Sequence, residues 1–258
     1  MKSLDLNEAI GISNGETVFL RADWPAPSNV HTLISTRNGG VSKAPFHSMN
    51  VGMHVGDDDE AVCENRRKIQ NQVGLPLKYL NQVHGTDVVQ AVDGEVPADA
   101  DASIDRSGMV ACAVMTADCL PVLFCDRMGT VVAAAHAGWR GLQGGILQNT
   151  VAAMGVPPEE ILAYLGPAIG ADAFEVGQDV YDAFCREMPL AEAAFEPIGD
   201  GKYLADIYML ARLILRREGV TQIYGGDRCT VLERDSFFSY RRDGKTGRMV
   251  SAIWLNKD

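Results

Sequence analysis

The segment 110–135 is the feature that most constrains how this chain can fold. It holds three short stretches, 110–115, 121–125 and 130–135, that are apolar almost without interruption. A strand with one solvated face alternates apolar and polar residues, so continuous apolar strands indicate burial on both faces. The turn at 126–129 joins the last two stretches as a hairpin. The sequence therefore predicts a sheet that is covered on both sides.

Helix and strand patterns alternate elsewhere, without a regular strand–helix–strand repeat. The clearest helix is predicted at 204–217, where Leu204, Ile207, Leu210, Ala211 and Ile214 follow helical spacing. Further helices are predicted at 57–73, 141–154 and 178–187, and further strands at 17–20, 31–35, 79–83, 87–92, 161–165, 222–224 and 249–255. This mixture predicts one α/β (α+β) domain with mixed sheets over residues 1–258.

The charge balance narrows the classes of partner. The chain has 34 Asp and Glu against 23 Lys and Arg, a formal net charge of −11. Nucleic acids and anionic membranes require a basic surface, so neither is an expected partner, whereas a small anion can still bind at a few local Arg side chains. Residues 1–13 lack the apolar core of a secretory signal, and no apolar stretch is long enough to span a bilayer. Six scattered cysteines without a CxxC pair indicate reduced thiols, so a cytoplasmic location is expected.

Two histidines and one cysteine at predicted strand ends are the candidates for chemistry. His84 lies in NQVHGTD, Cys119 in TADCLP and His136 in AAAHAGWRG. Three such ligands suit zinc, and also copper, and leave a fourth coordination position for water or substrate. The same atoms allow another chemistry, with Cys119 as a thiolate nucleophile and a histidine as its base. Their irregular spacing also fits buried structural side chains, and these alternatives stay open at this point.

Four more polar residues are candidates for binding substrate or phosphate. Arg37 stands in the glycine-rich turn STRNGGVS, and Arg140 opens a predicted helix in GWRGL. Both positions suit an anion, although an ordinary turn and a surface ion pair explain them as well. Asn50 and Glu175 lie in glycine-bounded loops, where each can orient a substrate or cap a turn. The Walker A, GxGxxG, HExxH, GxSxG and HxE…PCxxC motifs are absent.

Several segments, taken in order, resemble those of a known family: STRNGGVS, the stretch from Asn50 through HVGDD to ENR, NQVHG, TADCLP, HAGWRG, YLGPAIG, FEVG and FFSYRRDG followed by TGR. The chain is similar to the YfiH family, whose members are also called laccase-domain proteins, polyphenol oxidases and peptidoglycan editing factors, and which includes human FAMIN. The resemblance spans roughly residues 17–255 and implies a four-layer α/β/β/α sandwich.

The resemblance also implies an activity and a ligand set. It implies a zinc-dependent purine nucleoside phosphorylase for adenosine, inosine, guanosine and methylthioadenosine, with adenosine deaminase activity. His84, Cys119 and His136 would be catalytic and hold Zn²⁺, or copper as the alternative ion. Asp118, beside Cys119, is expected to relay a proton or to fix a ligand.

Three alternatives to the phosphorylase remain open, and two of them are enzymes. One is a copper-dependent polyphenol oxidase, although five His are few for several coppers. The other enzyme is a Cys–His hydrolase that edits peptidoglycan precursors. The third alternative is a non-catalytic protein stabilised by zinc, although a structural zinc normally has four protein ligands and this pattern offers three. The expected partners under the leading hypothesis are a small-molecule nucleoside and phosphate, with Arg37 or Arg140 holding the phosphate; the number of subunits is left open.

Overall fold

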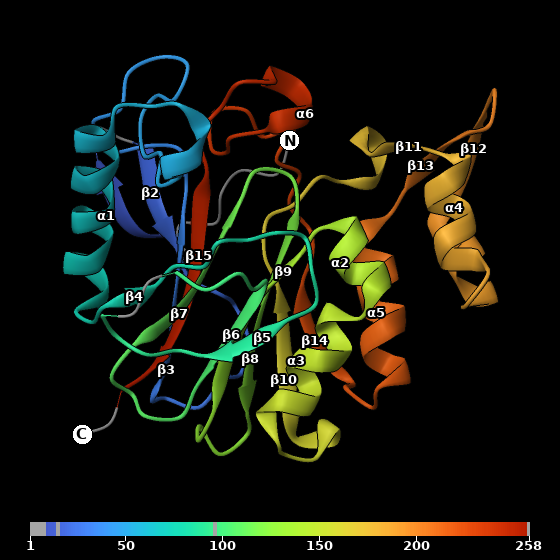
Figure 1. The fold of residues 1–258 in the computed structure, drawn as a ribbon, viewed down its shortest axis with the longest axis horizontal. Coiled ribbons are helices and arrows are strands. Elements are labelled where there is room, and N and C mark those ends of the chain that lie inside the picture. The colour runs from blue at the N-terminus through green and yellow to red at the C-terminus, as the bar shows by residue number, and fades with distance from the viewer. Residues whose placement is uncertain (1–8, 14–15, 95–96, 257–258) are drawn as a thin grey trace.

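Four layers make up the part of the chain that the structure describes (Figure 1). The computed structural model describes residues 9–13, 16–94 and 97–256. Two sheets pack face to face in the centre. Helix α1 (Asp59–Val73) covers the outer face of the first sheet, and α2 (Trp139–Gly144), α3 (Ile146–Met154) and α5 (Ile207–Arg217) cover that of the second. The predicted α/β class and α/β/β/α layering are confirmed.

The first sheet has the strand order β1-β2-β3-β15-β7-β4. Its paired strands are antiparallel, except that β4 runs parallel to β7. The strands are β1 (Ala9–Ser13), β2 (Glu16–Leu20), β3 (Val30–Ser35), β4 (Leu77–Lys78), β7 (Ala111–Thr116) and β15 (Met249–Leu255).

The second sheet has the order β14-β10-β8-β9-β6-β5. The edge pairs β14–β10 and β6–β5 are parallel, and the pairs between them are antiparallel. The strands are β5 (Val88–Gln90), β6 (Ala102–Asp105), β8 (Leu120–Asp126), β9 (Val132–Ala137), β10 (Ile161–Leu165) and β14 (Gln222–Gly225).

A small third sheet stands beside the sandwich with helix α4 and was not predicted (Figure 1). Tyr181 of the helix stacks on Tyr203 of the central strand, with 4.5 Å between ring centroids. The elements here are β11 (Glu175–Gly177), α4 (Gln178–Cys185), β12 (Phe195–Gly199) and β13 (Lys202–Ala205). The remaining short helices are η1 (Met53–Val55), η2 (Pro158–Glu160), η3 (Ala171–Ala173), η4 (Pro189–Ala194) and α6 (Tyr240–Asp243).

The core explains the uninterrupted apolar stretches. Along β9, Val132 and Ala134 belong to the core between the two sheets, while Ala133 and Ala135 belong to the core beneath the helices. All four side chains are fully buried. A strand in the middle of four layers has no solvated face, so both of its faces carry apolar residues.

Two predicted helices begin later than expected, because an aspartate caps each one. Helix α1 starts at Asp59 rather than at residue 57, since the Asp58 carboxylate accepts a hydrogen bond from the Glu60 backbone N–H at 3.0 Å. Helix α5 starts at Ile207 rather than at Leu204, since the Asp206 side chain caps it and Leu204 pairs in β13.

The prediction of one helix over 141–154 is wrong. The segment forms two helices, α2 and α3, which meet at Gly145 with a φ of 110°. Such a φ interrupts the right-handed helix and favours glycine. The break lets α2 begin at Trp139, directly beside the end of β9.

The predicted strand at 79–83 is also wrong, since this segment is a loop with one isolated bridge at Asn81. Its apolar residues are explained by loop packing: Leu80 is buried, and the Arg66 guanidinium lies 4.0 Å from the Tyr79 ring centroid. The other predicted strands are present, those at 161–165 and 249–255 with the predicted ends and the rest with shifted ends. In the two large sheets, β1, β4 and β6 were missed.

Among the described residues, no helix has both the length and the apolar character needed to cross a membrane. The prediction about a secretory signal concerned residues 1–13, and of these, 1–8 lie outside the described residues.

Candidate metal and substrate site

The candidate site lies where strands from both sheets end. Strand β7 ends at Thr116 and β8 begins at Leu120, so Cys119 lies in the turn between the two sheets. His136 is near the end of β9, and His84 lies in the loop that leads to β5. His84 lies 35 residues before Cys119 in the sequence, and His136 lies 17 residues after it. The fold brings all three to one edge of the sandwich, where loops at strand ends often form active sites.

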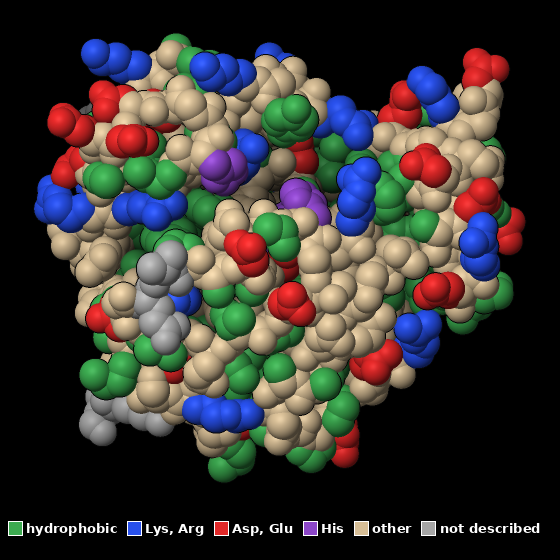
Figure 2. All heavy atoms as spheres, viewed as in Figure 1, with side chains coloured by type: hydrophobic (Ala, Val, Ile, Leu, Met, Phe, Trp, Pro, Cys, Tyr) green, Lys and Arg blue, Asp and Glu red, His purple; other side chains and the backbone are tan. Residues whose placement is uncertain are grey.

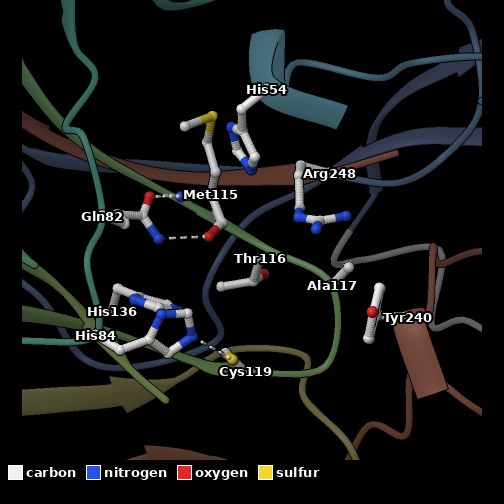
Figure 3. Close-up of a pocket in the computed structure, with 10 residues that line it drawn as sticks. All are labelled: His54, Gln82, His84, Met115, Thr116, Ala117, Cys119, His136, Tyr240 and Arg248. Carbon is white, nitrogen blue, oxygen red and sulfur yellow. Dashed lines mark hydrogen bonds between the residues drawn. The ribbon is translucent and has the colours of Figure 1, made fainter. Parts of the chain in front are cut away.

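The structure brings the three predicted metal ligands together. The ligand atoms of His84, Cys119 and His136 all lie within 4.8 Å of one another, and Cys119 Sγ is 3.8 Å from His84 Nε2 (Figure 3). Zinc with bonds of 2.0–2.3 Å separates its tetrahedral ligands by roughly 3.3–3.8 Å. The nitrogen and sulfur donors and their spacing therefore fit a zinc ion with small adjustments.

Asp101, a residue that the sequence analysis missed, orients both histidines. Its Oδ1 accepts hydrogen bonds from His136 Nδ1 at 2.7 Å and from the His84 backbone N–H at 3.1 Å. Its Oδ2 accepts from the backbone N–H groups of Val83 and Gly85. A proton held on Nδ1 leaves Nε2 of His136 free to bind a metal, as is usual for histidine ligands backed by a carboxylate.

The site groups shift one another's pKa. Burial alone would raise the pKa of Cys119, but the two neighbouring histidines outweigh it and lower the pKa to about 6. Burial alone would lower the pKa of His136, but Cys119 and Asp101 raise it to about 9. Burial opposes the charged form of Asp101, yet hydrogen bonds from His136 and the loop keep its pKa low. Without metal, the site is a thiolate–imidazolium pair at neutral pH.

We therefore expect the Cys119 thiol of the metal-free protein to react with iodoacetamide at a lower pH than an ordinary cysteine does, down to about pH 6. The thiolate is the reactive form, so the labelling rate is high above about pH 6 and falls as the pH drops through that value. Burial raises the pKa of Cys112 and Cys125 to about 12, so these thiols stay unreactive. Mass-spectrometric labelling rates from pH 4 to 9 measure the midpoint, with Cys119→Ala as background. A midpoint at or above about 8 would contradict this electrostatic picture.

The backbone beside two ligands is held in an uncommon conformation. His84 has a φ of 60° and Asp118, the neighbour of Cys119, a φ of 88°. Non-glycine residues at positive φ need support from their surroundings and cluster at functional sites. For His84, the support is the Asp101 carboxylate, which binds its backbone N–H.

Asp118 has no free carboxylate oxygen. Its Oδ1 accepts from Thr230 Oγ1 at 2.5 Å, and its Oδ2 accepts from Ser239 Oγ at 3.1 Å and from the Arg241 backbone N–H at 2.6 Å. These bonds fasten the segment 230–241 over the site and hold the turn that carries Cys119. Of the two roles expected for Asp118, fixing the position of a ligand fits this geometry better than relaying a proton.

Gly138 leaves room for the metal ligands, which gives a second prediction. A Cβ at this position would lie 2.8 Å from His84 Cδ2 and 3.2 Å from Cys119 Sγ. We expect Gly138→Ala to displace a ligand and to weaken zinc binding by about tenfold or more. Competition with a zinc chelator measures the affinity. The matched control is Gly85→Ala, whose Cβ makes only ordinary contacts; equal affinities in the two variants would contradict the tight packing.

Two lobes of one pocket meet at His84, Ala117, Cys119 and Tyr240. The first lobe, of about 360 Å³, is polar and is drawn in Figure 3; it adds His54, Gln82, Met115, Thr116, His136 and Arg248. The second, of about 280 Å³, is aromatic and apolar; it adds Asp118, Trp139, Arg140, Ile169, Phe174, Ile207 and Arg241. Figure 2 shows histidine side chains at a hollow in this face, with Lys and Arg side chains near its rim.

The predicted substrate residues are not all in this pocket. Arg140 lines the aromatic lobe and stacks on Trp139, with 4.3 Å from its guanidinium carbon to the ring centroid. Arg37 instead binds the backbone carbonyls of His47 and Arg234, and so ties two loops together. It does not line either lobe.

Asn50 and Glu175 do not line the lobes either. Asn50 is fully buried, and its Oδ1 accepts from the backbone N–H of Arg248 at 2.9 Å. Glu175 is exposed and pairs with Lys202 at 2.7 Å, while its backbone carbonyl accepts from the Arg241 guanidinium. Both residues hold chain segments that carry lobe residues.

These features define a class of protein: a four-layer α/β/β/α fold with a His–Cys–His group at one edge that could hold a metal ion. The chain belongs to the YfiH family, since the family model described as "Multi-copper polyphenol oxidoreductase laccase" matches residues 31–256. The resemblance seen in the sequence is thereby confirmed.

Named relatives and solved structures agree with this family. The chain is 56% identical to "Purine nucleoside phosphorylase YfiH" of Escherichia coli, over 90% of this chain and 96% of that protein. It is 52% identical to "Purine nucleoside phosphorylase PA4543" of Pseudomonas aeruginosa, over 92% and 98%. The crystal structure of Neisseria meningitidis NMB0706 is 70% identical, with a TM-score of 0.92 over 93% and 99% of the two chains. YlmD of Geobacillus stearothermophilus is 33% identical, with a TM-score of 0.88 over 93% and 97%.

The family description names several coppers, but the described residues form one metal-ligand group. All five histidines lie in the described part of the chain, where His84 and His136 join Cys119 as the only cluster of three or more ligands. His31 is elsewhere, stacked on Trp254. The described residues thus provide a single-ion site, and the donor set alone does not distinguish zinc from copper.

Proposed function

We propose that this chain is a zinc-dependent purine nucleoside phosphorylase that also deaminates adenosine. The observation that carries the proposal is the two-lobed pocket that converges on His84, Cys119 and His136. One lobe suits a planar base and the other a polar co-substrate, and both reach the metal ligands. The names of the relatives at 52% and 56% identity support the same activity.

His84 Nε2, Cys119 Sγ and His136 Nε2 would hold the ion, with Asp101 fixing both histidines in place. A zinc ion with an open position supplies a Lewis acid and lowers the pKa of water. Three protein ligands suit a catalytic rather than a structural zinc, which normally has four.

The aromatic lobe would bind the purine. Trp139, Phe174 and Tyr240 present ring surfaces there, and aromatic faces stack on planar heterocycles. In phosphorolysis, the bond from the sugar anomeric carbon to the base breaks and its electron pair leaves with the base. A phosphate oxygen then bonds to that carbon, and the phosphate proton ends on the base. The pocket's part is to hold both reactants in line.

The test is the fate of adenosine and inosine with zinc-loaded protein, followed by chromatography. We expect free adenine and hypoxanthine only when phosphate is present, and inosine from adenosine without phosphate. If neither base nor inosine forms at any phosphate concentration, the proposal is wrong. Guanosine and methylthioadenosine, run beside them, define which purines are accepted.

A second candidate is a Cys–His hydrolase acting on peptidoglycan precursors, and the low pKa of Cys119 favours it. It requires a free thiolate, whereas the phosphorylase requires a metal-bound one. An electrophilic substrate analogue traps Cys119 in the metal-free protein under either candidate. Only the hydrolase predicts turnover of a precursor amide by metal-free protein, so this turnover distinguishes them.

A further inference from the structure

The polar lobe contains a cationic side chain that the sequence analysis did not single out, Arg248. It directly precedes β15 and lies across the pocket from His84, His136 and Cys119 (Figure 3). Its Nη1 donates to the backbone carbonyls of Thr246 and Gly247, both at 3.1 Å. Among the described residues, no carboxylate forms an ion pair with Arg248. The guanidinium is therefore held in place by neutral partners and keeps its charge for a ligand.

The lining of the polar lobe favours an anion. It contains no Asp or Glu, in a protein with a formal net charge of −11. His54 stands beside Arg248 at the same end of the lobe, and Gln82 is fixed by two hydrogen bonds to the Met115 backbone (Figure 3). A dianion entering this otherwise acidic molecule needs such a local positive charge.

The aromatic lobe is a poorer place for phosphate, although it holds two arginines. Arg140 and Arg241 are both exposed, whereas Arg248 is partly buried. Each of the two also lies over an aromatic ring, Arg140 over Trp139 and Arg241 over Phe174. The Asp118 carboxylate also lies in that lining and would repel a dianion. In the polar lobe the guanidinium is partly buried and the lining holds no carboxylate, although the Asp118 charge also acts on Arg248.

Two residues of the loop 50–52 fix the position of Arg248. The Asn50 side chain accepts a hydrogen bond from its backbone N–H, and Gly52 lies under its stem. A Cβ at residue 52 would lie 2.9 Å from Arg248 Cγ. The loop around Asn50, which the sequence marked as a candidate for substrate orientation, thus acts on the pocket through Arg248.

We propose that Arg248 is the main ligand of an inorganic phosphate subsite in the polar lobe, on the other side of the metal ligands from the purine. The inference rests on the proposed phosphorylase activity and names where its co-substrate binds. Phosphate in this lobe and nucleoside in the other would approach the shared residues His84 and Cys119 from two sides. Such an arrangement suits displacement of the base by phosphate at the anomeric carbon.

Phosphate binding is tested first without turnover. Thermal unfolding of the zinc-loaded protein is followed across a phosphate titration, with chloride at matched ionic strength. We expect wild type to be stabilised by phosphate, and the midpoint concentration to rise by at least about tenfold in Arg248→Met. Arg248→Lys should give an intermediate value, because it keeps the charge but loses the planar fork. Gly52→Ala, which displaces the arginine without removing it, should also raise the midpoint.

Two controls separate this assignment from a general charge effect. Arg127→Met removes an exposed positive charge on the β8–β9 hairpin, next to Glu160, and should leave the phosphate midpoint within about twofold. Arg140→Met tests one of the two arginines that the sequence analysis expected to hold the phosphate, and it should also leave the phosphate midpoint unchanged. Equal midpoints in Arg248→Met and wild type, or no phosphate stabilisation of wild type, would overturn the assignment. Thermal midpoints without phosphate show that each variant is folded.

Kinetics then separates the subsite from the function. With active enzyme, Arg248→Met should raise the phosphate KM by at least about tenfold and leave the nucleoside KM within about twofold. An unchanged phosphate KM in an active enzyme would overturn the subsite and leave the phosphorylase standing. Arg248-dependent phosphate binding in a protein that converts no nucleoside would overturn the phosphorylase and keep the anion site.

Discussion

Replacement of Cys119 by alanine is expected to abolish both metal binding and nucleoside turnover. The thiolate is one of three ligands, and two histidines alone make a much weaker zinc site. The zinc content should fall from about one ion per chain to less than about one-tenth of an ion per chain. The value of kcat/KM should fall more than about a hundredfold. Inductively coupled plasma mass spectrometry and the chromatographic assay measure the two quantities on the same preparation.

Cys63→Ala is the control for this experiment, because Cys63 is an exposed cysteine on α1 and belongs to no metal-ligand group. It should keep its zinc and its activity. Full zinc content in Cys119→Ala would show that the ion lies elsewhere. Loss of zinc with full activity would show that the reaction does not depend on the ion.

Replacement of Asp101 by asparagine is expected to have the second largest effect. The carboxylate accepts four hydrogen bonds, from His136 Nδ1 and from the backbone of residues 83–85. In the asparagine side chain, an NH₂ group replaces one of the carboxylate oxygens. This group is a donor and would face N–H donors, so the hydrogen bonds to that oxygen would be lost. We expect zinc affinity to fall about tenfold to a hundredfold, since the histidines lose their orientation, and the free energy of unfolding to fall by about 1–3 kcal/mol.

Chelator competition and denaturant unfolding measure these two effects separately. The matched control is Asp99→Asn, an exposed residue two positions earlier whose carboxylate accepts from the Asn81 side chain. It should change neither quantity appreciably. If Asp101→Asn also leaves zinc affinity unchanged, the carboxylate has no part in holding the metal ligands.

The sequence was most informative where one physical requirement dominates. The strands β7, β8 and β9 were predicted because both of their faces are buried, which leaves a continuous apolar stretch. The segment 79–83 carries a similar pattern for another reason, since Leu80 and Tyr79 pack under a loop. Composition within five residues does not distinguish a buried loop from a strand.

The site shows the same division. His84, Cys119 and His136 could be named as candidates because imidazole and thiolate groups are chemically distinctive. The family resemblance, rather than their spacing, favoured the role of metal ligands over the alternatives. Asp101 could not be named, because one aspartate in ADADAS looks like the others, and its role depends on β6 lying next to β9. Arg248 lies in the TGR segment that the resemblance includes, but it was given no role, since only the fold brings the residue before β15 opposite the turn that carries Cys119. Arg37 drew attention through its glycine-rich turn, but its guanidinium is used to tie loops together.

Phosphorus NMR of the zinc-loaded protein with inosine and inorganic phosphate shows whether this chain is a phosphorylase. We expect a sugar 1-phosphate signal to grow as inorganic phosphate declines, in a one-to-one ratio with the hypoxanthine released. Removal of the zinc should stop both changes. Hypoxanthine without a sugar phosphate would show hydrolysis instead, and an unchanged spectrum with no free base would contradict the phosphorylase assignment altogether.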